Sequence, residues 1–166
     1  MAMAMTWGDR AKDASLVPVR LALGGSMLYH GMQKLRGEGP ARTGEMFEGM
    51  GIKPGKPWAL ATGLAEAAAG FLAVVGLATR PAALAVLVTQ AVAISKVHAP
   101  KGYNVMNGGM EYNLALMAIA VALLVAGPGR FSAHEAFERA VEGDGAQGLW
   151  RRARPTALSR VVRLVK

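Results

Sequence analysis

The stretch between Arg80 and Arg130 limits most strictly what this chain can fold into. It holds two uncharged apolar runs, fifteen residues at 81–95 and eighteen at 112–129, on either side of a connector rich in Gly, Asn, Lys and His. The second run is long enough to cross a bilayer as a helix, and the first reaches that length once the start of the connector is included. Because neither run carries the polar stripe of a surface helix, we expect a hairpin of two membrane helices.

Two further apolar runs precede this hairpin, at 16–33 and at 58–79. A loop rich in Gly and Pro separates them, and residues 43–50 inside it predict a short helix at the mouth of the fold. A cleaved signal peptide is the alternative for the first run, but no small-x-small cleavage site follows it. We therefore expect four membrane spans.

The expected fold is all-α, an integral membrane four-helix bundle of up-down topology with a C-terminal amphipathic tail. The composition, 52% hydrophobic and only 18% charged with 21 Gly, suits helices that pack closely in lipid. A soluble helical bundle is the alternative, but its helices would need polar outer faces. The predicted parts are a cytoplasmic lead at 1–15, a four-span domain at 16–130 and a basic amphipathic tail at 131–166.

The tail is strongly basic, because residues 148–166 hold six Arg or Lys and no acid. We expect it to bind anionic lipids rather than nucleic acid, as a basic amphipathic helix at 158–166. A solvated, disordered tail is the alternative. Four spans place both termini on one side of the membrane. That side carries eleven Lys or Arg, and the opposite loops carry seven. This excess predicts an inner-membrane protein with both termini in the cytoplasm.

Topology brings the unusual polar residues of the spans to the opposite, outer leaflet. Glu66 is the strongest functional candidate among them. Gly63 and Gly70 on the same helix face mark a contact with another helix, so the Glu66 side chain is expected to point into the bundle. A carboxylate there requires a partner or a proton, and Lys34, Lys96 and His98 are the candidate partners. A structural interhelical hydrogen bond is the alternative. Arg20 is expected near the other surface, snorkelling toward the start of its helix.

We predict Glu66, His98 and Glu111 as the chemically active groups. For His98 and Glu111 the alternative is connector and helix-cap chemistry, because a glutamate at a helix start also complements the dipole. Haem ligation by His30 with His98, or a metal site of Glu66, Glu111 and His98, lacks any further supporting motif. The residues expected to bind a cofactor are His30, Gln33, Lys34, Gln90, Lys96 and Tyr103.

Several spaced motifs resemble the DoxX family of small membrane proteins. The most specific is His98-x-x-x-Gly102-Tyr103 followed by Gly108-Gly109-x-Glu111. The others are Arg20-Leu-Ala-Leu-Gly24 with Gly31-x-x-Lys34, Phe47-x-x-Met50-Gly51, Gly63-x-x-Glu66-x-x-x-Gly70 with Gly76-x-x-x-Arg80, and Gly127-Pro128-Gly129-x-x-Ser132. His134 departs from the family pattern, which often has an acidic residue at that position.

The resemblance implies a four-helix inner-membrane protein of a redox system, linked to quinone-dependent sulfur oxidation or to oxidative stress. A quinone would then meet Lys34 and His98 as donors, with Glu66 or Glu111 taking protons. The chain has no cysteine and no flavin or nicotinamide fingerprint, so electrons would come from a soluble partner protein or a bound cofactor. A non-catalytic scaffold for soluble partners, a small-solute or lipid transporter, and a homo-oligomer stay open as alternatives.

Overall fold

The computed structural model describes residues 7–142, and every regular element within that range is a helix. The predicted tail helix at 158–166 lies outside the described residues. The α-helices are α1 (Trp7–Leu35), α2 (Gly39–Gly49), α3 (Gly55–Val75), α4 (Thr79–Ala93), α5 (Glu111–Ala126) and α6 (Ala133–Glu142). Three short turns join α4 to α5: the π-helix η1 (Ile94–His98) and the 3₁₀ turns η2 (Ala99–Lys101) and η3 (Val105–Asn107).

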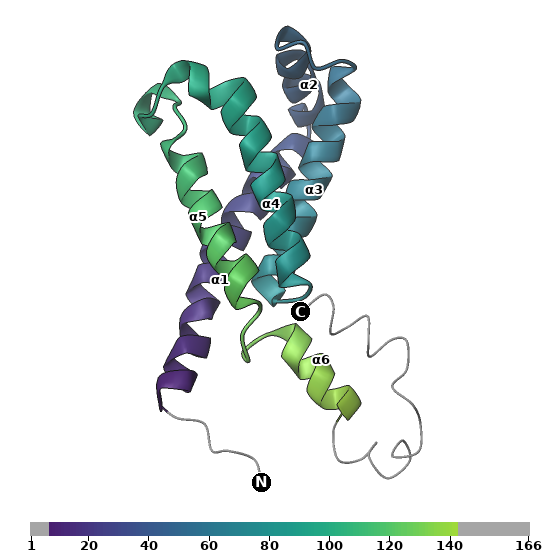
Figure 1. The fold of residues 1–166 in the computed structure, drawn as a ribbon. Coiled ribbons are helices and arrows are strands. Elements are labelled where there is room, and N and C mark those ends of the chain that lie inside the picture. The colour runs from purple at the N-terminus through teal and green to yellow at the C-terminus, as the bar shows by residue number, and fades with distance from the viewer. Residues whose placement is uncertain (1–6, 143–166) are drawn as a thin grey trace.

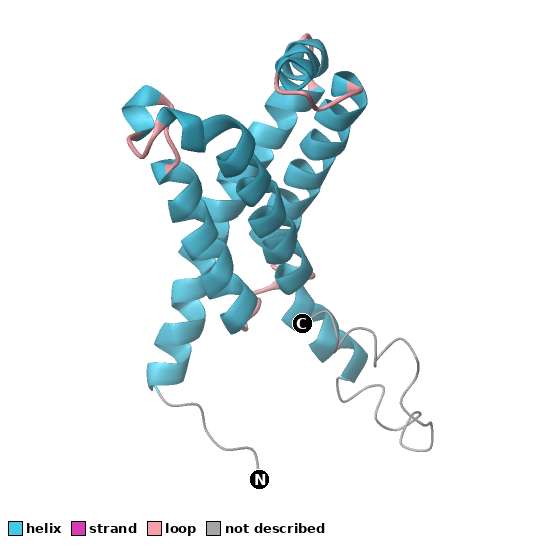
Figure 2. Cartoon of the chain, turned by 45° about the horizontal axis from the view of Figure 1, so that its top comes forward, coloured by secondary structure: helices cyan, strands magenta, loops and turns pink. Residues whose placement is uncertain are grey.

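Four long helices share one core. Side chains of α1, α3, α4 and α5 form a single buried cluster that includes Leu23, Ala69, Val86, Leu116 and Leu123. Figure 1 shows α2 and the α4–α5 connector at one end of these helices, and the start of α1 with α6 at the other end. Figure 2 shows the same two ends from a tilted view and no strand in the described part. The all-α prediction is therefore confirmed.

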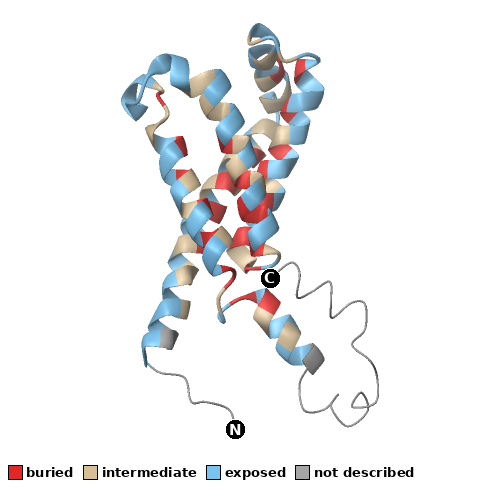
Figure 3. Ribbon diagram, in the orientation of Figure 1, coloured by how far each residue is buried: buried red, intermediate tan, exposed pale blue. Residues whose placement is uncertain are grey.

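The outer surface of the long helices is apolar, as lipid contact requires. Buried residues gather between the helices, and exposed ones cover their outer sides (Figure 3). Many of the exposed ones are large and apolar, including Phe71, Leu84, Val88 and Val125. A soluble helix would carry polar groups at such positions.

Among the described residues, two helices are long and apolar enough to span a bilayer. They are Gly55–Val75 and Thr79–Lys101, the latter being α4 with η1 and η2. The helix 111–126 is apolar but shorter. The hairpin prediction is confirmed as a packed pair of helices, whereas four membrane crossings stay a prediction.

Helices α1 and α3 approach each other through glycines. A Cβ built on Gly24 would lie 2.6 Å from the Gly70 carbonyl oxygen, and one built on Gly31 would lie 2.4 Å from the Ala67 nitrogen. Both contacts are with backbone, so the helix axes would have to separate to admit a methyl group. Small residues at such a contact let dispersion forces hold two helices together where the hydrophobic effect is absent.

Gly24→Ala should lower the free energy of unfolding by about 1–3 kcal/mol, because the methyl group overpacks a backbone contact. Gly25→Ala is the matched control, since nothing lies within 4 Å of its added Cβ. That substitution should stabilise the helix by up to about 1 kcal/mol through helix propensity. Denaturant unfolding in bilayer nanodiscs measures both. Equal stability of the two variants would contradict the close α1–α3 contact.

Arg20 does not snorkel, and that prediction is wrong. The residue is 4% exposed, and its guanidinium donates two hydrogen bonds of 2.6 Å, to the carbonyls of Pro128 and Phe131. It therefore fixes the turn between α5 and α6. Ser132 caps the next helix, because its Oγ accepts a hydrogen bond of 3.2 Å from the Glu135 amide.

Arg20→Met should destabilise the protein by about 1–3 kcal/mol, because two buried carbonyls lose their donors. Protease cleavage between α5 and α6 should become faster in the same variant. The control is Arg42→Met, which changes an exposed residue of α2. If both variants behave like the unsubstituted protein, Arg20 does not hold this turn.

Candidate functional site

Glu66 of α3 and Lys34 of α1 form an ion pair between apolar helices. Lys34 Nζ lies 2.6 Å from Glu66 Oε2, and the side chains are 20% and 6% exposed respectively. The glycine contact between α1 and α3 brings the two backbones close enough for this pairing. Of the three partners that the sequence offered to Glu66, Lys34 is the one that forms the bond. The carboxylate points into the fold, as the spacing of Gly63 and Gly70 predicted.

His30 lies one helical turn before Lys34, on the same end of α1. Lys34 Nζ is 3.4 Å from the His30 carbonyl oxygen. The His30 ring packs edge-on against Tyr29 at a centroid distance of 5.5 Å and lies 6.0 Å from the ring of Tyr112. The Tyr112 hydroxyl is in turn hydrogen-bonded to Ser26 Oγ. A histidine and a tyrosine of two helices therefore stand next to the ion pair.

Gln90 of α4 is buried and joins three helices. Its Oε1 accepts a hydrogen bond of 2.7 Å from Asn113 Nδ2 of α5, and its Nε2 lies 3.5 Å from Met27 Sδ of α1. Both amide side chains are nearly inaccessible, with Gln90 5% and Asn113 6% exposed. Their mutual bond removes most of the cost of placing amides among apolar helices.

These contacts form two groups that adjoin along the chain at Ser26–Met27 and at Tyr112–Asn113, and we call them together the polar layer. Every one of the four long helices contributes to it. Its members are Ser26, Met27, His30, Lys34, Glu66, Gln90, Tyr112 and Asn113.

His98 and Glu111 are engaged in the connector rather than in the polar layer. His98 Nδ1 is 2.7 Å from the Gly108 carbonyl oxygen, and Glu111 Oε2 accepts a hydrogen bond of 3.1 Å from the Val105 amide. Both bonds close the loop between α4 and α5, which supports the alternative of connector chemistry. Their role as active groups stays a prediction.

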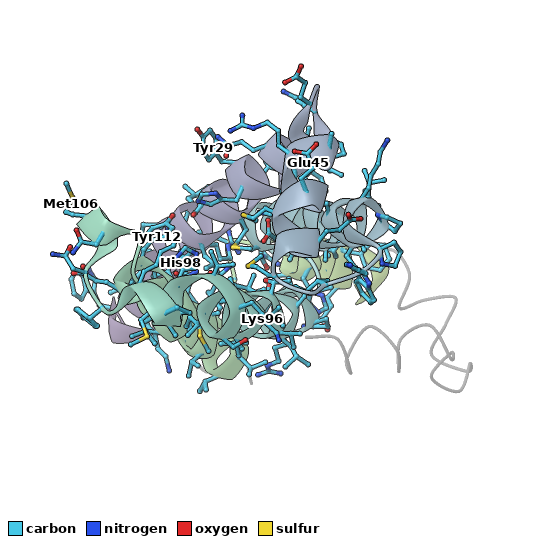
Figure 4. The ribbon with its side chains drawn as sticks, turned by 90° about the horizontal axis from the view of Figure 1, so that it is seen from above. Tyr29, Glu45, Lys96, His98, Met106 and Tyr112 are labelled. Atoms are coloured by element: carbon cyan, nitrogen blue, oxygen red, sulfur yellow. The ribbon has the colours of Figure 1, made fainter. Side chains whose placement is uncertain are left out.

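Three other predicted binding residues are exposed. Gln33, Lys96 and Tyr103 are open to the surroundings, and Tyr103 is 60% exposed. Seen from above, Tyr112 and His98 lie on one side of the molecule, and Glu45 of α2 lies on the other (Figure 4). The structure therefore brings together His30, Lys34 and Glu66. It buries Gln90 against Asn113 and Met27, and it leaves the remaining predicted residues exposed or in the connector.

The described residues offer no cluster of three or more His, Asp or Glu that could hold a metal ion. The alternative metal site of Glu66, Glu111 and His98 is therefore not formed. Its members are tied to separate partners, Glu66 to Lys34 and the other two to the connector backbone.

Tyr112, Asn113 and Ser26 are members of the polar layer that the sequence did not mark as binding residues. For Asn113 a signal exists, since an amide two residues into an apolar run needs a partner, and Gln90 is the matching amide in the neighbouring run. Ser26 gives no comparable signal, because a serine in a helix ordinarily bonds its own backbone.

The fold and the polar layer define a helical membrane protein with an ion pair buried among apolar helices. A family model described as DoxX matches residues 15–99, slightly more than half of the chain. The chain belongs to the DoxX family, a family of membrane proteins, in agreement with its sequence motifs. No curated protein and no solved structure matches it. The matched segment includes Lys34 and Glu66 and ends before α5.

The two halves of the ion pair should differ in their effect on stability. Lys34→Ala leaves the deeply buried Glu66 without its partner and should cost about 3–5 kcal/mol. Glu66→Gln should cost only about 1 kcal/mol, since the Lys34 ammonium can reach water from the last turn of α1.

The double variant Lys34→Met/Glu66→Gln removes both charges and should lie within about 1 kcal/mol of the unsubstituted protein. Denaturant unfolding in nanodiscs compares all three variants. A double variant less stable than either single variant would show that the charges themselves hold the fold together.

Proposed function

We propose that this chain is an integral subunit of a quinone-linked membrane redox system. The quinone head binds at the polar layer beside the Lys34–Glu66 pair. All four long helices cross the inner membrane with both termini in the cytoplasm, so the polar layer lies toward the outer leaflet. The apparent excess of basic residues at the termini supports this orientation.

The main support for this proposal is that the contact between α1 and α3 does not require the Lys34–Glu66 ion pair. Glycines already bring the α1 backbone against that of α3, at Gly24 with Gly70 and at Gly31 with Ala67. A buried ion pair adds little stability over a well-packed apolar pair of the same size. Ionisable groups within membrane helices mark sites of proton or ligand handling. Lys34 and Glu66 are therefore best explained by what they bind.

The surrounding residues fit an amphipathic ligand with a polar ring head. Tyr112 is 41% exposed and His30 is half-buried, so a ligand in the bilayer can reach groups that adjoin the buried pair. The Lys34 ammonium donates hydrogen bonds to carbonyl oxygens, and the Glu66 carboxylate accepts protons. A bound quinone takes up two electrons and two protons on reduction to the quinol. The electrons come from a partner protein or a bound cofactor, because the chain has no thiol, and Glu66 takes protons and passes them to the quinone.

A second candidate is a scaffold that holds soluble partners at the membrane. Its support is the connector, whose predicted active groups are used to close a loop while Tyr103 and Met106 are 60% and 87% exposed. Exposed large side chains on an ordered loop suit a protein contact.

Binding of a short-chain ubiquinone to the nanodisc-embedded protein tests the first proposal. Lys34→Met/Glu66→Gln should weaken binding at least tenfold, because donor and acceptor are both lost. The matched control is Glu45→Gln, the same chemical change at an exposed residue of α2, and it should bind normally. Equal binding by all three proteins would remove the quinone site from the polar layer and favour the scaffold.

A further inference from the structure

Helix α6 turns its polar side toward the rest of the protein. His134 is 2% exposed, its amide donates a 3.2 Å hydrogen bond to the Gly76 carbonyl, and its Nε2 lies 3.7 Å from Glu138 Oε1. Glu135 and Glu138 are only partly exposed. An amphipathic helix packed on a soluble core would instead bury its apolar side.

The apolar side of α6 is exposed in the described part of the chain, residues 7–142. Phe131, immediately before the helix, is 60% exposed, and Phe137 is 46% exposed. Ala133, Ala136 and Ala140 fall on the same face as Phe137 at helical spacing, and all three are exposed. We call these five residues the α6 apolar face. Contiguous apolar surface of this kind, rimmed by polar residues, marks a contact with a membrane or another protein.

The N-terminal end of α6 is held at the end of the apolar core. α5 ends at Ala126, and the turn that follows is held by Arg20 through the Pro128 and Phe131 carbonyls. Since α5 and α4 are apolar along their lengths, this end of the core is where the bilayer surface must lie. The α6 apolar face therefore starts at the level of the lipid headgroups.

Charge and size both favour lipid over protein as the occupant. Arg130 and Arg139 are exposed beside the face, and six further Arg or Lys without an acid follow in the sequence at 148–166. A ten-residue helix is about 15 Å long. A helix of that length buries far less than the roughly 800 Å² per partner of a stable protein interface. Phenylalanines on the apolar face of a surface helix insert at the headgroup boundary, and basic residues add attraction to anionic lipids.

We propose that α6 lies on the cytoplasmic surface of an anionic bilayer, with Phe131 and Phe137 inserted among the lipid chains. The basic flank faces phosphate headgroups, and the buried His134 side keeps the helix attached to the core. This membrane contact is independent of the quinone site, because it lies at the opposite end of the long helices (Figure 1).

The absence of cysteine allows single fluorescent labels without a background substitution. Phe137→Cys and, as control, Asn107→Cys in the connector are each labelled with an environment-sensitive dye in nanodiscs of phosphatidylcholine with phosphatidylglycerol. The label at 137 should be quenched by doxyl lipids and protected from iodide, whereas the label at 107 should be quenched by iodide. Replacing phosphatidylglycerol with phosphatidylcholine should weaken the doxyl quenching at 137.

Two outcomes would overturn the proposal. Strong iodide quenching at 137 would place the α6 apolar face in water. Protection from both quenchers would mean that protein covers the face, either a second copy or the chain's own C-terminal segment.

Discussion

The close approach of α1 and α3 is the constraint on which the rest of the structure depends. Without a side chain at Gly24, Gly31, Gly63 and Gly70, the two backbones come near enough for Lys34 to reach Glu66 directly. The same approach sets the position of Met27 and Ser26 against Gln90 and Tyr112. A wider spacing would leave a carboxylate among apolar helices with no partner, which membrane proteins avoid.

Polar groups have different roles at the two ends of the long helices. At one end, the polar layer places an ion pair beside partly accessible aromatic rings, an arrangement that suits a ligand. At the other end, Arg20 donates its hydrogen bonds to the backbone carbonyls of Pro128 and Phe131 and holds the turn before α6. In our proposal the Lys34–Glu66 pair serves binding, whereas the Arg20 guanidinium serves architecture.

The sequence was most informative where the pattern was local. Apolar run lengths predicted the helices, and the spacing of Gly63, Glu66 and Gly70 predicted that Glu66 faces inward, because helical periodicity links residues a few positions apart. The fate of Arg20 could not be predicted in this way. Its partners lie more than a hundred residues away, and only the tertiary fold brings Pro128 and Phe131 to it.

The connector residues could not be resolved for a related reason. His98 and Glu111 have the side chains that redox and proton chemistry use, and the same side chains also close loops. Which role they take depends on backbone carbonyls and amides whose directions no residue pattern reveals. The sequence therefore proposed one converging site, whereas the structure separates an ion-paired layer from a self-contained connector.

We propose above all that Lys34 and Glu66 bind a quinone. The most direct measurement is the quinone content of lipid extracts from the purified protein and from a folded Lys34→Met/Glu66→Gln variant. The account predicts quinone in proportion to protein for the unsubstituted chain, and its loss in the variant at unchanged stability. Equal quinone content in both proteins would contradict it.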